Sequence, residues 1–315
     1  MSVQTQIDRL TKAKSDLKVS ITNKGVAVSD DALISDYPAL VDSIQTGGKI
    51  NVSDGWSFGY SSINQDMIDQ LDFTGIDDFS YKFYSTKFTS NVTFTGLSAR
   101  KIHNLFSSTL GSTLELKNFN YTGSSNDSPF NYCKIKNLLL TNAKLSSCNS
   151  FFYLNNYNDV ETITLNGVDT SNASDFSNFF SFFYGTCGDY NSLNTSSAVK
   201  FTSMFYNSVL DEMIDLSSWN TSKVTNMSYM FNINYNSVQS STKDRLKTLD
   251  LSNWNTSNVT NMNDIFKGRE LLTTVKVINC NDATKQKILA QLQTDLSSKT
   301  WTLGDDGIIT GVASS

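Results

Sequence analysis

A single histidine, His103, limits the catalytic chemistry open to this chain of 315 residues. A hydrolase that activates serine through histidine would have to use His103, and the nearby hydroxyls in sequence are those of Ser107 and Ser108. A nucleophile and its base must lie within hydrogen-bond reach in the fold, which closeness in sequence does not ensure. We therefore interpret His103 as a residue on the surface of the fold.

Pairs of adjacent acidic residues suggest a second kind of chemistry, and they occur at Asp30-Asp31, Asp77-Asp78 and Asp305-Asp306. Two carboxylates at a defined separation could cleave a glycosidic bond, and carboxylates also bind metal ions. Each pair lies in sequence where a solvent-exposed turn or a cap is expected. We predict that the protein is not an enzyme and has no catalytic residue, metal site or cofactor.

Cysteine chemistry is also unpromising, because the chain has four cysteines and no C-x-x-C pair. Structural zinc sites and disulfide frameworks need tighter or more regular spacing. We predict that Cys133, Cys148, Cys187 and Cys280 are reduced thiols that fill small positions of the core.

Tyrosines beside asparagine and serine are better candidates for function, and the sequence contains 13 tyrosines. Aromatic rings can stack on the apolar faces of sugars, while asparagine and serine supply hydrogen-bond partners. The same residues also suit protein recognition, and the sequence does not decide between the two. The predicted ligand surface consists of tyrosines in or near loops between repeats: Tyr153, Tyr157, Tyr184, Tyr190, Tyr206 and Tyr235.

The elements that must position these tyrosines are repeats. Residues 214–231 (IDLSSWNTSKVTNMSYMF) return as residues 249–266 (LDLSNWNTSNVTNMNDIF). Each copy begins with alternating apolar and polar residues, as a half-buried strand does, and Asn-Thr-Ser then favours a turn. Val224, Met227 and Phe231 follow at i, i+3 and i+7, which predicts a short helix. One repeat is therefore predicted to be strand, turn and short helix, an α/β unit.

Degenerate copies of this repeat extend upstream to residue 71. Strand pairs begin near residues 71, 92, 114, 138 and 163, a poorly marked one lies near Leu193, and the last begins at Val275. These intervals are typical of leucine-rich-repeat coils and predict about nine coils in a parallel solenoid. Stacking would place Trp219, Asn220 and Thr221 over Trp254, Asn255 and Thr256 in ladders that close the core. The predicted core residues are Leu138, Leu140, Ile163, Leu165, Ile214, Leu216, Val224, Met227, Phe231, Leu249, Leu251, Val259, Met262 and Phe266.

At these residues the chain resembles a known family, the leucine-rich-repeat-like repeats of BspA-type bacterial surface proteins. The resemblance is closest at residues 214–231 and 249–266, and over 71–280 it weakens towards the N-terminal end to the apolar skeleton. It implies a leucine-rich-repeat-like solenoid used for binding or display, with no enzymatic activity.

The N-terminal segment carries a second pattern, in which Ile7, Leu10, Lys14, Leu17 and Ile21 step by three and four residues. This spacing predicts an a/d seam. The helix either packs on the next segment as part of a cap or associates with copies of itself, most plausibly as a homotrimer. The seam, the motif KGVAV at 24–28 and a second short helix over 33–44 together resemble the N-terminal segment of phage tail-fibre and other virion fibre proteins. That resemblance implies attachment to a virion and oligomerisation.

Four regions follow from these patterns: a helical docking or trimerisation segment at 1–48, an N-terminal cap at 49–70, the solenoid at 71–280 and a C-terminal cap at 281–315. Trp56, Phe58 and Tyr60 alternate as in a strand of the first cap. For the second cap, a helix that starts with Asp282 and a hairpin through the turn GDDG are predicted. The caps would cover the open ends of the solenoid.

The net charge and the composition of the chain ends argue against a nucleic-acid partner and against membrane insertion. With a net charge of −5 and a pI near 4.9, the chain has no basic stripe for phosphates, so we expect no nucleic-acid partner. Residues 1–20 contain no apolar signal-peptide core, no sorting motif is recognised at the chain end, and no membrane insertion is expected.

Our leading hypothesis is a phage virion structural protein. It would be a tail or head fibre that docks to other virion proteins by its N-terminus and presents the solenoid to a glycan or protein of the host surface. The alternative is a BspA-like adhesin located on a bacterial cell surface, against which the absence of an export signal counts. A glycan-cleaving depolymerase is a third hypothesis.

Overall fold

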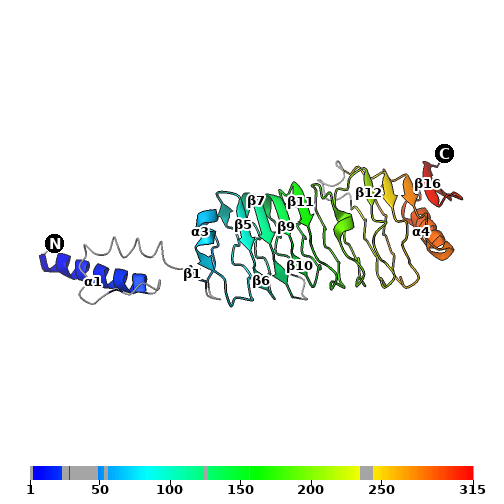
Figure 1. Cartoon of the computed structure of the whole chain (residues 1–315). Helices are drawn as coiled ribbons and strands as arrows, with labels where there is room; N and C mark the ends of the chain where they lie inside the picture. The colour runs from blue at the N-terminus through cyan, green and yellow to red at the C-terminus, as the bar shows by residue number, and fades with distance from the viewer. Residues whose placement is uncertain are drawn as a thin grey trace. The chain divides into compact units, whose positions relative to one another are not determined.

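The computed structural model describes residues 3–22, 28, 49–52, 56–123, 127–155, 157–234 and 244–314. The chain divides into two compact units, the first made of residues 1–53 and 66–74 and the second of residues 54–65 and 75–315. Figure 1 draws the chain with its elements labelled.

The first unit contains helix α1 (Val3–Thr22), the parallel pair of strands β1 (Ile50–Asn51) and β3 (Leu71–Asp72), and most of helix α3 (Gln65–Asp69). On α1, the predicted seam residues Ile7 and Leu17 are 50% and 42% exposed, whereas Ile21 is buried. A side chain buried within its own chain is not free to meet a partner. The side chain of Leu10 and the helix predicted over 33–44 lie outside the described residues.

The second unit is a parallel β-solenoid, so the prediction of a parallel repeat solenoid is confirmed (Figure 1). Its strands form three sheets, ordered β11-β9-β7-β4-β2 with β5 also on β7, then β10-β8-β6, and β12-β13-β14-β16-β15. The strands of the first two sheets are β2 (Ser62–Ile63), β4 (Lys87–Phe88), β5 (Val92–Thr95), β6 (Ser98–Ala99), β7 (Leu110–Lys117), β8 (Asn120–Tyr121), β9 (Lys134–Thr141), β10 (Lys144–Leu145) and β11 (Thr162–Asn166). Those of the third are β12 (Met213–Asp215), β13 (Thr248–Asp250), β14 (Thr274–Lys276), β15 (Lys299–Leu303) and β16 (Ile308–Ala313).

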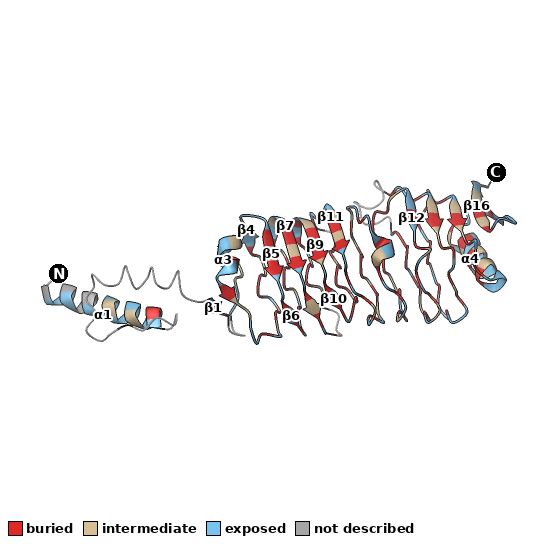
Figure 2. Cartoon of the chain, viewed as in Figure 1, coloured by how far each residue is buried: buried red, intermediate tan, exposed pale blue. Residues whose placement is uncertain are grey.

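Equivalent residues of successive coils lie side by side. Leu114 pairs with Leu138 and Leu138 with Ile163, and further along the chain Ile214 pairs with Leu249. Between β11 and β12 the short 3-10 helix η2 (Tyr190–Ser192) takes the place of a strand, where the sequence marks the strand poorly. All the predicted core residues are buried, and the strands alternate buried and exposed positions (Figure 2).

A stack of phenylalanine rings runs through the interior of the second unit, and we call it the spine. Consecutive rings lie 5.2–6.0 Å apart between centroids, with interplanar angles of 2–15°. Its nine members are Phe58, Phe83, Phe106, Phe130, Phe152, Phe180, Phe205, Phe231 and Phe266. Phe58 therefore opens the spine instead of lying in the strand predicted for residues 56–60. A stack of offset rings fills the core and aligns the coils.

The return leg of each coil, which carries the spine residue, is not the predicted short helix. In the leg that ends at Phe231, alternate N–H groups donate to the next coil, those of Met227, Tyr229 and Phe231 to the carbonyls of Asn261, Asn263 and Ile265 at 2.8–2.9 Å. The N–H of Met230 donates back to Met227, as in a tight turn. Tyr229 has a φ of 59°, which a right-handed helix does not allow. The return leg is therefore a series of tight turns, and the α/β assignment of the repeat is wrong. Such turns place apolar residues at i, i+3 and i+7 just as a helix does, which explains the error.

The corner between strand and return leg is built in two ways. From β6 to β10 it is a parallel ladder in which Ala99, Tyr121 and Leu145 are buried. Beyond β10 a column of buried threonines follows, which we call the threonine ladder. Its members are Thr170, Thr195, Thr221, Thr256 and Thr284.

In the threonine ladder, the hydroxyl replaces a backbone group. The Thr221 hydroxyl donates to the carbonyl of Asn255 at 2.9 Å and accepts from the N–H of the same residue at 2.7 Å. The predicted threonine ladder is therefore present. The side chain of Asn255 turns back on its own segment and accepts from the N–H of Ser257 at 2.9 Å, so the asparagines cap local turns.

The second unit ends in helix α4 (Asp282–Asp295) and the hairpin of β15 and β16. Asn281, one residue before the predicted position, caps α4 by accepting from the N–H of Thr284 at 2.8 Å. Strand β16 pairs antiparallel with β14, so the hairpin covers the edge that β14 would otherwise leave open.

Candidate binding surface

The return legs contain recurring positions with a left-handed backbone. One row of such positions consists of Ser85, Ser108, Tyr132, Phe182 and Asn207, with φ between 53° and 61°, and each N–H donates to the next coil. Left-handed backbone costs a residue with a side chain roughly 1–2 kcal/mol, and least for asparagine, aspartate or glycine. Serine and asparagine are unremarkable there, whereas bulky residues are outliers. Tyr132 and Phe182 therefore occupy positions that the backbone does not favour for them.

These two outliers belong to a group of rings that we call the aromatic cluster, made of Tyr132, Tyr153, Phe182, Tyr184 and Tyr206. The Phe182 ring lies 5.6 Å from that of Tyr153 and 5.6 Å from that of Tyr206, and it is nearly perpendicular to both. Tyr132 is 39% exposed, and the other members are half-buried. The cluster combines ring faces with phenolic hydroxyls at the surface.

The phenols of the cluster influence one another. Burial raises the pKa of Tyr153, and the neighbouring phenols of Tyr132 and Tyr206 raise it further. Burial and the Tyr153 phenol raise the pKa of Tyr184 to about 12. These hydroxyls consequently stay protonated below pH ~10, and each can donate and accept a hydrogen bond.

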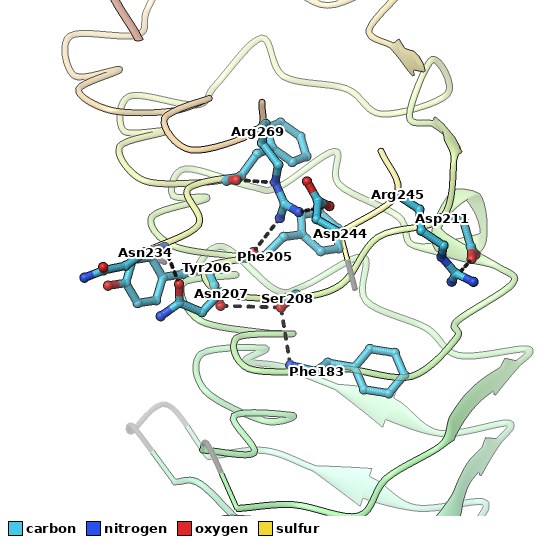
Figure 3. A network of polar contacts seen from close by, with 11 residues as sticks. Phe183, Phe205, Tyr206, Asn207, Ser208, Asp211, Asn234, Asp244, Arg245 and Arg269 are labelled. Carbon is cyan, nitrogen blue, oxygen red and sulfur yellow. Dashed lines mark hydrogen bonds and ion pairs between the residues drawn. The ribbon is translucent and has the colours of Figure 1, made fainter. Parts of the chain in front are cut away.

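Two loops border the aromatic cluster. In one, the Asn158 amide donates to the carbonyls of Asn155 and Phe182 at 2.8 and 2.9 Å, which fixes the loop beside Tyr157, itself 72% exposed. In the other, the Asn207 amide oxygen accepts from the N–H of Asn234 at 2.6 Å (Figure 3). The second bond holds the start of the segment that makes the repeat between β12 and β13 longer than the others.

A buried ion pair anchors the far end of that long segment. Arg269 is fully buried, and its Nη1 lies 2.6 Å from Asp244 Oδ1 (Figure 3). Its Nε and Nη2 donate to the carbonyls of Phe231 and Phe205 at 2.6 and 3.4 Å. Asp244 Oδ2 is buried and has no hydrogen-bond partner among the residues that the structure describes. The pair therefore ties two spine carbonyls to the end of the segment.

Arg269 occupies a position that carries a hydroxyl in other coils, three residues after the spine phenylalanine. There, Thr86 and Thr109 donate to the carbonyls of Phe58 and Phe83 at 2.9 and 2.6 Å, and Ser208 donates to the carbonyl of Phe180. Asn234 holds this place after Phe231, and Arg269 reaches the Phe205 carbonyl instead. The arginine side chain is long enough to donate to a spine carbonyl in each of two coils.

The predicted ligand tyrosines have different fates. Tyr153, Tyr184 and Tyr206 come together in the cluster, and Tyr157 borders it. Tyr190 was wrongly placed at the surface: it is 6% exposed and packs edge-on against Phe180 and Phe205 at 5.5 and 5.3 Å. Tyr235 lies outside the described residues.

Tyr132 and Phe182 are the members that sequence reasoning missed. Each follows its spine phenylalanine, Phe130 or Phe180, by two residues. Aromatic residues at that offset are the signal that could have found them once the spine was aligned.

The residues considered for catalysis make structural contacts or are buried. Nδ1 of His103 is 3.9 Å from Asp127 Oδ1, and Asp127 Oδ2 accepts from the N–H of Ile102 at 3.0 Å and from the hydroxyl of Tyr121 at 3.2 Å. Ser107 is buried.

Of the acidic pairs, Asp77 and Asp78 form ion pairs with Arg100 and Lys101 at 2.6 and 3.4 Å. Asp306 closes the turn of the last hairpin by accepting from the N–H of Ile308 at 3.0 Å. Asp30 and Asp31 lie outside the described residues.

All four cysteines are buried and unpaired, and burial raises the pKa of Cys133 to about 12. Over the described ranges, histidine, cysteine and acidic side chains form no group of three or more that could hold a metal ion. Within the same part of the chain no helix has the length and apolarity to span a membrane.

Comparison with known proteins supports the repeat and adds no function. A family model described as Mycoplasma protein of unknown function, DUF285, matches residues 146–243 and 236–292, just under half of the chain. Neither curated proteins nor solved structures give a match. The match covers Tyr153, Phe182, Tyr184 and Tyr206, and residues 1–145 lie outside it. The C-terminal half of the solenoid is thus similar to the DUF285 repeats.

Proposed function

We propose that this protein is an attachment protein whose solenoid presents the aromatic cluster to a glycan or protein on a cell surface. The observation that carries the proposal is the gathering of the five rings of the aromatic cluster at the surface, with two of them, Tyr132 and Phe182, at strained backbone positions. At the same turn Ser85, Ser108 and Asn207 carry small side chains and Gly268 none, whereas Tyr60 in the first coil is a further bulky outlier, and backbone outliers of this kind concentrate at functional sites. The Tyr132 side chain gains little stabilisation from packing, because it is 39% exposed.

The carrier in this proposal is a phage virion, with the protein as a tail or head fibre. The support is the resemblance of the N-terminal segment to virion fibre proteins, together with the exposure of Ile7 and Leu17 on α1. Self-association through these residues would repeat the cluster several times on one particle, and multivalency strengthens weak contacts. The alternative is a bacterial cell-surface adhesin, which the likeness to BspA-type and DUF285 repeats favours.

The binding half of the proposal is tested by comparing Tyr132→Asn with Tyr229→Asn. Both replace a tyrosine with positive φ by asparagine, so both should leave the free energy of unfolding unchanged or raise it by up to about 1 kcal/mol. Labelled full-length protein is incubated with a panel of bacterial envelopes. The wild type and Tyr229→Asn should bind the same envelopes, and Tyr132→Asn should bind at least tenfold more weakly. Equal binding by both variants, or no binding by the wild type, refutes the proposal.

The assembly half is tested by the mass of the full chain in solution, with and without Ile7→Asp and Leu17→Asp. We expect a trimer for the wild type and a monomer for the double variant, because charged residues disrupt an apolar seam. Lys12→Ala, which removes only an exposed ion pair to Asp16, is the control. A monomeric wild type contradicts the trimeric fibre and leaves binding by the solenoid open.

A further inference from the structure

We propose that the ligand of the aromatic cluster is an uncharged, hydroxyl-rich chain, a neutral glycan of several sugar units that lies along the solenoid axis. This inference rests on the proposed function and names the ligand class of the same surface. Three features of the cluster support it: its chemistry, its lack of charge and its direction.

The chemistry of the cluster matches that of a sugar. Sugars present apolar faces of C–H groups, which stack on aromatic rings, and hydroxyls that both donate and accept hydrogen bonds. The rings of Tyr153, Phe182 and Tyr206 are in contact, and the phenols of Tyr132 and Tyr206 both act on that of Tyr153. With the pKa of Tyr153 and Tyr184 raised, both phenols remain donors across the physiological pH range.

The cluster carries no charge of its own. None of its five members is acidic or basic, and the bordering amides of Asn158 and Asn207 are uncharged and buried. The charged residues next to it in sequence, Lys134 and Asp159, have opposite signs. Arg269 is fully buried and neutralised by Asp244, so it offers nothing to a ligand. An anionic glycan or a phosphate would call for exposed arginine or lysine, which the cluster does not supply.

The cluster extends along the axis. Tyr132, Tyr153, Phe182 and Tyr206 follow the consecutive spine residues Phe130, Phe152, Phe180 and Phe205 by two, one, two and one positions. Neighbouring parallel strands are spaced by about 4.8 Å, so four consecutive coils span about 14 Å. A row of rings this long fits a chain of several sugars better than a single sugar.

The experiment uses full-length protein and an envelope to which the wild type binds. Before binding, portions of the envelope are treated with periodate, which cleaves vicinal diols of sugars, or with protease. We expect periodate to reduce binding at least tenfold, protease to leave it unchanged, and a rise from 0.05 to 0.5 M salt to change it less than twofold. Tyr206→Phe, which keeps the ring and removes the hydroxyl, should bind several-fold more weakly than the wild type. Tyr229→Phe is the matched control.

Each other outcome overturns the inference in a distinct way. Loss of binding after protease alone identifies a protein receptor, and strong weakening by salt identifies a charged ligand. Both outcomes leave the proposed attachment function standing if Tyr132→Asn still weakens binding. If no envelope binds the wild type, the proposed function fails first.

Discussion

Two regions of the solenoid build the same corner from different groups. Around β6, β8 and β10, residues 98–145, backbone groups of adjacent strands bond directly and apolar side chains point inward. From residue 170 to 284, the threonine ladder exchanges those bonds through hydroxyls. Strands shorten along with this change, from eight residues in β7 and β9 to three in β12, β13 and β14. A hydroxyl that donates and accepts can therefore replace a stretch of β ladder.

The difference explains where the sequence is repetitive. A backbone ladder accepts many side chains, so the first region keeps only an apolar skeleton. In the second region the ladder position needs a hydroxyl, so it must be threonine or serine. Its neighbours must also turn the chain, and the sequence Asn-Thr-Ser meets both requirements. The DUF285 match starts at residue 146, close to the change at Thr170. The DUF285 match thus includes the region in which side chains carry the hydrogen bonds.

The largest expected effect is that of Arg269→Met, which removes the longest side-chain bridge of the second region. It leaves Asp244 buried without its partner, and breaking such a pair costs about 3–5 kcal/mol. The measurement is the free energy of unfolding by denaturant. Arg245→Met breaks an ion pair to Asp211 whose side chains are 54% and 42% exposed, so it should cost under about 1 kcal/mol. Similar losses for both variants would show that Arg269 is no bridge.

Thr221→Val tests the threonine ladder itself. The shape is nearly kept, but the N–H and the carbonyl of Asn255 lose their partner inside the protein, which should cost about 2–3 kcal/mol. Leu145→Val, at the equivalent corner position of the first region, should cost about 1 kcal/mol for one buried methylene. Equal costs in denaturant unfolding would mean that the two corners do not differ in kind.

Tyr190→Phe examines the place where η2 interrupts the strands between the two regions. Burial raises the pKa of Tyr190 well above its usual value of 10, and Cys187 and Asp211 add to this. In the unfolded chain this phenol ionises near pH 10, so its stabilising contribution is complete below pH 10 and is lost as pH rises further. The unfolding midpoint of the wild type should therefore fall more steeply above pH 10 than that of Tyr190→Phe. Parallel curves would refute the burial of the phenol.

Asp169→Asn should have the smallest effect. Hydrogen bonds from the side chain and the N–H of Ser171, with Lys144 nearby, lower the pKa of Asp169. Its contribution is present above the usual pKa of 3.8 and is lost as pH falls through the lowered value. Asparagine serves the same turn at Asn194, Asn220 and Asn255. The variant should match the wild type at pH 7 and lose less stability between pH 4 and 2, and a loss at pH 7 would contradict this role.

Sequence reasoning could find the repeat because burial and register follow from apolar spacing. It could not distinguish a helix from successive tight turns, because the spacing of Val224, Met227 and Phe231 fits both. The two structures differ in which carbonyl each backbone N–H donates to, and spacing does not show that. For the same reason, spacing alone does not choose between Phe151 and Phe152 or between Phe179 and Phe180, and the second residue of each pair joins the spine. The cluster was found in part: tyrosines in loops were recognisable, but the burial of Tyr190 depends on η2, and the strain at Tyr132 is a backbone property.

The spine has a consequence for how this molecule can change its length. Each inner ring of the spine packs on the ring before it and the ring after it, and the hydroxyls of Thr195 and Thr221 bond to the following turn of chain. A duplication or loss of one whole repeat, such as 221–255, therefore rejoins the same surfaces. The copies at 214–231 and 249–266, identical at 12 of 18 positions, show that two such units already stand side by side. Reach could thus be adjusted in steps of about 4.8 Å per added turn, while the aromatic rings upstream stay as they are.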